Sequence, residues 1–216
     1  EDSSHAGRPW LCVTGTNGKT TTVGMLGSIL RASGASVAEV GNIGLPICEA
    51  VDTDAEVFAV ELSSFQLHTV STVSPLASVC LNDHLDWHGS AEAYAADKAK
   101  VYHATQVACF YPSSDIEIEH MVAEADVIEG ARAIGLTLGI PSISQLGWVE
   151  DALVERAFVE RRHMQAQFLA EVDDLRIAYH DGVTDAARMD ATAAAGLARA
   201  YGVNPEAVAQ GLRDFH

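Results

Sequence analysis

The sequence predicts an α/β domain in which a mostly parallel sheet is flanked by helices and ends in a small β-rich edge. Up to about residue 138, nearly continuous apolar runs alternate with helical stretches, which is typical of parallel strands covered on both faces. From about Gln145 to Ala178 the apolar runs are short and interrupted by charges, which favours hairpins at the sheet edge. We expect one domain over residues 10–216, preceded by a flexible segment over residues 1–9.

The first part of the chain is expected to alternate strands with helices. The apolar runs predict strands at Trp10 to Val13, about Ser36 to Val40, Glu56 to Leu62, and Leu76 to Leu81. Helical periodicity predicts one helix from Thr20 to about Ala32, with Gly34 as its C-terminal cap, and another from Ala91 to Tyr102.

The later part continues the alternation and closes with two helices. We expect strands at Gln106 to Tyr111 and Ala133 to Leu138, with a helical segment between them at Met121 to Ala125. An Ala-rich stretch predicts a helix over Asp185 to Tyr201, closed by Gly202. Asn204 is expected to cap a last helix, with Pro205 at its first position.

The net charge, the apolar runs and the cysteine spacing of the sequence exclude several classes of function. The 216 residues carry a formal net charge of −17, which argues against non-specific binding to nucleic acid or to an anionic membrane. The N-terminus shows no signal peptide and the sequence contains no apolar run long enough to span a membrane, so we expect a cytoplasmic protein. The four cysteines, which form no CxxC pair, are expected to be small buried hydrophobes in a reducing compartment: Cys12, Cys48, Cys80 and Cys109.

The most informative segment is Val13–Thr22, VTGTNGKTTT. Its glycines let backbone N–H groups converge on an anion at the start of a helix, whose N-terminus is partially positive. Lys19 could reach the terminal phosphates of a nucleotide, and the Thr20 hydroxyl could bind Mg²⁺. A plain strand-turn-helix corner would not need a lysine followed by three hydroxyl residues. The predicted nucleotide contacts are Gly15, Thr16, Asn17, Gly18, Lys19, Thr20 and Thr21.

The GxxGKT spacing is shorter than the general GxxxxGK[ST] pattern, which disfavours ordinary GTPases and motor ATPases. TGTNGKTTT resembles the ATP loop of the Mur ligase superfamily, whose central domain is P-loop NTPase-like. Within that superfamily, four more segments are similar to the ligases that add D-glutamate to UDP-N-acetylmuramoyl-L-alanine: GNIGLP at 41–46, ELSSFQL at 61–67, DHLD at 83–86 and ADKAKVY at 96–102. The run DHLDWHGSAEAYAADKA at 83–99 is similar to the actinobacterial branch of these ligases. The resemblance covers the whole chain but only that central domain, so the UDP-binding and C-terminal domains are expected to lie outside it.

The resemblance assigns metal-binding and catalytic roles. Glu61 ends an apolar strand, where a carboxylate faces the ligand crevice of a parallel sheet, and by resemblance it binds Mg²⁺ together with Thr20. His84 is implied to hold a second Mg²⁺, although a lone histidine is more often structural and the loop between Asn82 and His84 is shorter than the family pattern. Lys98 is implied to react with CO₂ as an uncharged amine and to carry a carbamate. Lys100 is its competitor.

Substrate and base contacts also follow from the resemblance. Asn42, Ser63 and Gln66 are implied to contact the muramoyl-peptide substrate, while Asn42 and Ser63 could instead cap neighbouring helices. Asp190 stands where the family carries an asparagine near adenine, and its carboxylate could accept from the adenine amino group. The His-Asn pair of the family is replaced by Ala186–Ala187, so base recognition stays open, and Asp190 could be a plain exposed acid near the helix start.

The expected reaction is ATP-dependent amide formation through an acyl phosphate, with ATP, UDP-N-acetylmuramoyl-L-alanine and D-glutamate as partners and Mg²⁺ as cofactor. The isolated domain is expected to be inactive without the other two domains. Two alternatives stay open. One is another Mur ligase or a folylpolyglutamate synthase-like ligase, and the other is a nucleotide-binding module without catalysis.

Overall fold

A computed structural model of the chain describes residues 7–42, 45–50, 52–82 and 91–216. Within these ranges nine strands form one sheet in the order β2-β3-β1-β4-β5-β6-β7-β8-β9. The strands are β1 (Trp10–Thr14), β2 (Val37–Gly41), β3 (Val57–Glu61), β4 (Ala77–Cys80), β5 (Ala108–Pro112), β6 (Arg132–Leu136), β7 (Gln145–Val149), β8 (Ala152–Glu155) and β9 (Gln167–Glu171). The helices are α1 (Lys19–Ala32), α2 (Ile47–Ala50), α3 (Ser64–Thr69), α4 (Ala91–Ala99), α5 (Ile116–Ala123), α6 (Asp185–Tyr201) and α7 (Pro205–Asp214), with 3₁₀ turns η2 (Lys100–Tyr102) and η3 (Val172–Leu175).

The direction of the strands confirms the predicted architecture. In the order of the sheet, each pair of neighbouring strands from β2 through β1 to β7 is parallel. The last two pairs, β7 with β8 and β8 with β9, are antiparallel. The antiparallel strands form the β-rich edge that the broken apolar pattern after Gln145 predicts. The domain division, with residues 1–9 apart from 10–216, stays a prediction. Residues 1–6 lie outside the described residues, and Arg8 donates to the carbonyl oxygens of Thr53 and Ala55.

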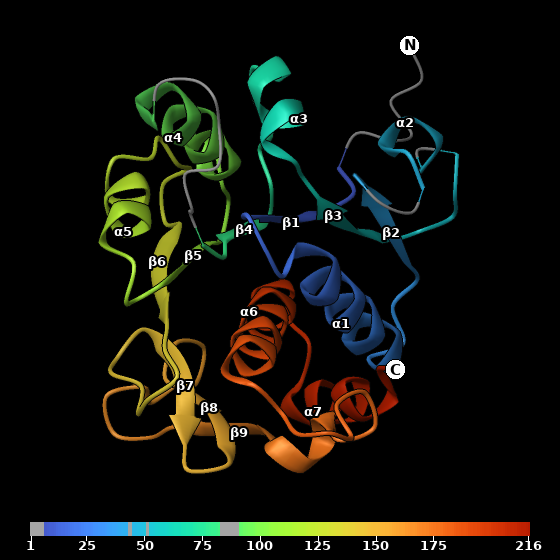
Figure 1. The fold of residues 1–216 in the computed structure, drawn as a ribbon, viewed down its shortest axis with the longest axis vertical. Coiled ribbons are helices and arrows are strands. Elements are labelled where there is room, and N and C mark those ends of the chain that lie inside the picture. The colour runs from blue at the N-terminus through green and yellow to red at the C-terminus, as the bar shows by residue number, and fades with distance from the viewer. Residues whose placement is uncertain (1–6, 43–44, 51, 83–90) are drawn as a thin grey trace.

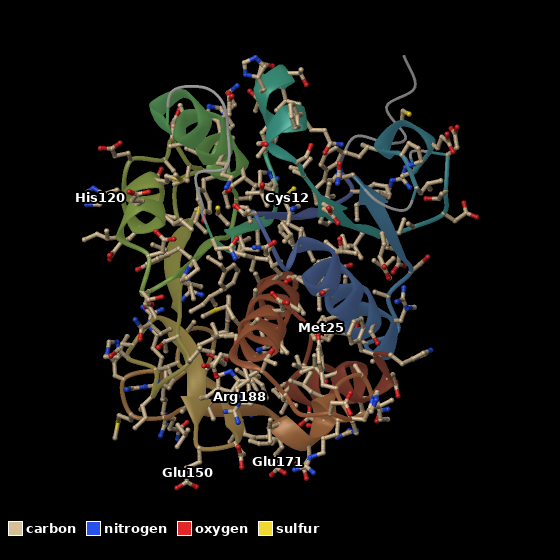
Figure 2. The ribbon with its side chains drawn as sticks, in the orientation of Figure 1. Cys12, Met25, His120, Glu150, Glu171 and Arg188 are labelled. Carbon is tan, nitrogen blue, oxygen red and sulfur yellow. The ribbon has the colours of Figure 1, made fainter. Side chains whose placement is uncertain are left out.

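Helices cover the sheet on both faces (Figure 1), with α1, α6 and α7 on one face and α3, α4 and α5 on the other. Each face buries its own apolar cluster. Met25 of α1 belongs to the first cluster and Cys12 of β1 to the second, and Figure 2 shows the two side chains on opposite sides of β1. Since successive side chains of a strand point to opposite faces, Leu11 and Val13 contact the first cluster while Cys12 contacts the second. Burial on both faces explains why the strand sequences are almost continuously apolar.

Helix boundaries differ from the prediction where capping decides them. The helix expected at Met121–Ala125 begins earlier, at Ile116, because the Asp115 side chain caps it by accepting from the N–H groups of Glu117 and Ile118. The two shortest helices, α2 and α3, have too few residues to show a helical period, so the sequence pattern does not predict them. By contrast, α6 has its predicted bounds, and Gly202 ends it in a left-handed conformation (φ 104°).

The cysteines divide into two groups. Cys12, Cys80 and Cys109 are buried, as expected, but Cys48 is exposed, so the prediction of burial is wrong there. Burial raises the pKa of the Cys12 thiol and raises that of Cys109 to about 11. Both thiols are therefore protonated and poorly nucleophilic near neutral pH. Among the described residues, no helix combines the length and apolar character that crossing a membrane requires.

Candidate functional site

The topology brings three strand ends to one place. The chain adds β3 on one side of β1 and β4 on the other, so the carboxyl ends of all three parallel strands meet. The register pairs Val13 with Glu61 and Thr14 with Cys80. A crevice at such a reversal of strand order is the usual ligand site of open parallel sheets. The residues that follow these three strands are therefore the candidate site.

The loop from Gly15 to Gly18 links β1 to α1. Gly15 (φ 144°) and Gly18 (φ 83°) have positive φ values, which side chains disfavour. Gly18 is the N-cap of α1, no side chain caps the helix, and no acidic residue lies in its first turn. The partial positive charge of a 14-residue helix thus meets the loop without a protein carboxylate in that turn. This arrangement is suited to bind the phosphates of a nucleotide.

Glu61 lies beside the loop, as the strand-end position predicts. The Thr20 hydroxyl donates to Glu61 Oε2 (2.9 Å) and Asn42 Nδ2 donates to Glu61 Oε1 (3.2 Å). The Glu61 side chain is 2% exposed and so has a fixed orientation. A hydroxyl and a carboxylate oxygen are the hard ligands that Mg²⁺ prefers, so this pair fits the metal. Asn42 contacts Glu61, and within the described part of the chain it caps no helix.

The three lysines of the candidate set lie in different surroundings. Lys19 Nζ donates to the carbonyl oxygens of Gly15 (2.9 Å) and Thr16 (3.2 Å). Lys98 is 1% exposed, and its Nζ lies 3.3 Å from Thr16 Oγ1. Lys98 of α4 is therefore directed at the loop from the opposite side to α1. Its role stays a prediction.

Lys100, the competitor of Lys98, points elsewhere. Its Nζ donates to Leu67 O (3.1 Å) and His68 O (3.2 Å) at the end of α3, and it pairs with Asp97 (2.9 Å). Burial of Asp97 opposes its ionisation, but hydrogen bonds from Lys100 and His68 outweigh burial and hold the pKa of Asp97 below its ordinary value. Lys100 thus ties α3 to α4 and does not contact the loop.

Ser63 and Gln66 satisfy each other. Ser63 is the N-cap of α3, its Oγ accepts from Gln66 N, and Gln66 Oε1 accepts from Ser63 N (2.9 Å) and from Ser63 Oγ (2.9 Å). This is a capping box, so the capping alternative is correct for Ser63. Both residues follow β3 and stay on the same sheet edge as Glu61, and their contact with substrate stays a prediction.

Asp190 belongs to the wall of the loop. It is 9% exposed, and its Oδ1 accepts from Thr22 Oγ1 at 3.3 Å. A Cβ at Gly18 would overlap the same oxygen. The alternative of an exposed acid near the helix start is therefore wrong. Burial raises the pKa of Asp190 to about 7, although the Thr22 hydrogen bond lowers it.

Asn82 also contacts the loop, although the sequence prediction of the site does not include it. Its Oδ1 accepts from the N–H groups of Thr16 (2.9 Å) and Asn17 (3.0 Å). A polar residue after the buried β4 run was the available signal, because β4 flanks β1. His84 lies outside the described residues, and among those described no three His, Cys, Asp or Glu residues gather into a metal site. Thr21 is partly buried in the first turn of α1.

Similar proteins are found by sequence and by structure. The Mur ligase middle domain family matches residues 13–128. The UDP-N-acetylmuramoylalanine–D-glutamate ligase of Streptomyces coelicolor is 55% identical over 96% of this chain and 44% of its own length. The enzyme of that name from Leifsonia xyli is 47% identical over 99% of this chain and 43% of its own length.

A solved UDP-N-acetylmuramoyl-L-alanyl-D-glutamate–2,6-diaminopimelate ligase superposes with a TM-score of 0.74 at 16% identity, over 96% of this chain and 46% of its own. This likeness concerns the fold alone. The chain spans less than half the length of the curated relatives it matches. The family match covers more than half of the 216 residues and includes the phosphate loop, Glu61 and Lys98. The chain belongs to the Mur ligase family.

Proposed function

We propose that this chain is the ATP-binding part of a ligase that joins D-glutamate to UDP-N-acetylmuramoyl-L-alanine in the cytoplasm. The observation that carries the proposal is the meeting of the phosphate loop, which leads into the N-terminus of α1 that no side chain caps, with the buried Glu61 (Thr20 Oγ1 to Glu61 Oε2, 2.9 Å). The proposal is also supported by the 55% identity of this chain to the UDP-N-acetylmuramoylalanine–D-glutamate ligase of Streptomyces coelicolor. The domains for UDP and for the amino acid belong to the proposal as parts outside this chain.

The reaction has two steps. A carboxylate oxygen of the muramoyl substrate attacks the γ-phosphorus of ATP, the bond from that phosphorus to the bridging oxygen breaks, and ADP leaves. The uncharged amine of D-glutamate then attacks the carbonyl carbon of the acyl phosphate. Phosphate leaves with the electrons of its C–O bond, and the nitrogen loses a proton to become an amide. Catalysis of such transfers is mainly positioning and stabilisation of charge.

The first step brings two anions together, the substrate carboxylate and ATP, in a protein of net charge −17. The residues of the loop reduce the repulsion between them. The N–H groups of the loop and the N-terminus of α1 offset the negative charge of the phosphates. The ammonium of Lys19, already within the loop, adds a full positive charge. Thr20 and Glu61 would hold Mg²⁺, which when bound neutralises phosphate oxygens.

Lys98 is proposed to carry the carbamate. Burying an ammonium is costly, and the Lys98 side chain is 1% exposed while its Nζ lies beside Thr16. Reaction with CO₂ would replace the buried cation with an anion that, with His84, holds a second Mg²⁺. Asp190 is proposed to lie near the adenine, and Asn42, Ser63 and Gln66 near the muramoyl peptide.

A chimera tests the proposal. This chain replaces the matching segment of the Streptomyces coelicolor relative, and phosphate release from ATP is measured with UDP-N-acetylmuramoyl-L-alanine and D-glutamate. We expect activity that needs both substrates, and its loss in the Lys19→Ala chimera. Arg31→Ala is the control that keeps activity, because the exposed Arg31 lies at the other end of α1, where it pairs with the half-buried Glu39.

Substrate replacement separates the alternatives. Phosphate release with L-lysine or with folate and glutamate, and none with D-glutamate, would assign the chain to another ligase of the superfamily. ATP binding by the chimera without any phosphate release would favour a nucleotide-binding module without catalysis. Either result contradicts the proposed function.

A further inference from the structure

The phosphate loop is hydrogen-bonded to oxygens of the protein itself. Asn82 Oδ1 accepts from two successive N–H groups, those of Thr16 (2.9 Å) and Asn17 (3.0 Å). Two successive N–H groups that converge on one oxygen form the kind of concave site that binds an anion. Asn82 therefore places a neutral oxygen where the loop offers its donors to a phosphate.

The position of Asn82 is built into the fold. Leu81 N donates to Thr14 O (3.0 Å), which extends the pairing of β4 with β1 up to the loop. A Cβ on Gly15 would come within 3.1 Å of Leu81 Cβ and 3.4 Å of Asn82 N. Glycine at position 15 thus lets the segment after β4 lie tightly against the loop. The main chain therefore holds Asn82 beside the loop, whichever rotamer its side chain adopts.

If the side chain of Asn82 moves away from the loop, the two N–H groups differ in whether they still have a hydrogen-bond acceptor. Thr16 N also donates to the main-chain oxygen of Asn82 (3.2 Å). Asn17 is exposed and donates to the side-chain oxygen. Displacement of Oδ1 consequently delivers the N–H of Asn17 to a ligand while Thr16 N retains a partner.

We propose that Asn82 is a positioning residue whose side-chain oxygen occupies a phosphate-oxygen position and is displaced when nucleotide binds. This inference rests on the proposed function in one respect, namely that the loop binds phosphates. An anionic phosphate oxygen makes a stronger hydrogen bond with N–H than a neutral amide oxygen does, so the exchange favours the nucleotide. The residue thereby sets affinity and keeps the loop ordered between turnovers.

Substitutions at position 82 give opposite expectations for a displaced oxygen and for a permanent brace. Asn82→Ala removes the competing oxygen and should tighten ADP binding about fivefold, since a net hydrogen bond changes affinity by roughly two- to tenfold. Asn82→Asp places a carboxylate on the same N–H groups and should weaken ADP binding more than tenfold, because its hydrogen bonds are charge-assisted and it repels phosphate.

The experiment is calorimetric titration of the chain with Mg-ADP and, separately, with inorganic tripolyphosphate as a probe without the base. Both probes should show the order Asn82→Ala tightest, wild type intermediate and Asn82→Asp weakest. Asn204→Ala, which removes the cap of α7, controls for general destabilisation and should bind as wild type does. Circular dichroism checks that each variant is folded.

The outcomes separate this inference from the proposed function. If folded Asn82→Ala binds more weakly than wild type while Lys19→Ala does not bind, the displacement of Asn82 is overturned. The proposal that the loop binds phosphates then still stands. An effect with Mg-ADP that is missing with tripolyphosphate also overturns it. Wild-type binding that is absent, or unchanged by Lys19→Ala, overturns the proposed function and the inference together.

Discussion

Replacing Asp190 with asparagine should stabilise the protein at neutral pH. Burial raises the pKa of Asp190 from 3.8 to about 7. A group whose pKa is higher in the folded state is favoured in its protonated form, so its contribution to stability is fully present below the unfolded pKa and is lost as pH rises. Asparagine has the same shape and accepts the Thr22 hydrogen bond, but it does not ionise.

The magnitude follows from linkage. Each pKa unit corresponds to about 1.4 kcal/mol, so the rise from 3.8 to about 7 makes the folded wild type less stable by up to about 4 kcal/mol above pH 7. The difference between Asp190→Asn and wild type should be near zero at pH 4, increase by about 1.4 kcal/mol per pH unit, and level off near pH 7. The negative charge of Asp190 also acts on the nearby Tyr179. Burial, and after it the charge of Asp190, raises the pKa of the Tyr179 hydroxyl.

The assay is urea unfolding at half-unit steps from pH 4 to pH 8, followed by circular dichroism. Asp54→Asn, an exposed aspartate before β3, is the matched control and should change stability little at any pH. A difference between Asp190→Asn and wild type that stays constant across this range would refute the reasoning. Greater stability of wild type at pH 8 would refute it as well.

Two further substitutions test the packing that supports the site. Tyr102→Phe should lower the free energy of unfolding by about 1–3 kcal/mol, because the buried hydroxyl accepts from Cys80 N (3.0 Å) and donates to Phe110 O (2.8 Å). Unchanged stability in urea unfolding would contradict the assigned bonds. Gly211→Ala should destabilise by at least about 1–3 kcal/mol, because its Cβ would overlap the Ile29 backbone. A thermal midpoint equal to that of wild type would contradict the close contact of α1 with α7.

The sequence predicts the sheet and the central loop because both depend on local patterns. Strands buried on both faces must be apolar almost throughout, so β1 and β3 are visible without knowledge of their partners. Gly15, Gly18, Lys19 and Thr20 all lie within one short stretch of the chain, residues 15–20. The position of Glu61 follows from a general property of parallel sheets, that their carboxyl ends share an edge.

Other features depend on tertiary contacts that local patterns do not encode. Asn82 is separated from Thr16 by 66 positions, and only the placement of β4 beside β1 brings them together. Asp190 resembles an ordinary acid in the first half of a helix, and its burial appears only when α6 packs against α1. The same holds for Lys100, whose partners Leu67 and His68 come from α3. Helical periodicity predicts too late a start for α5, because the start is set by the Asp115 cap and not by the apolar pattern.

The most direct measurement is the gain in unfolding free energy caused by Mg-ADP in wild type and in Lys19→Ala. At a ligand concentration one hundred times its dissociation constant, binding to the folded wild type should add about 2.7 kcal/mol. The gain should vanish in Lys19→Ala at the same concentration and persist in Arg31→Ala, which alters the opposite end of α1. An equal gain in Lys19→Ala and wild type would contradict phosphate binding at this loop.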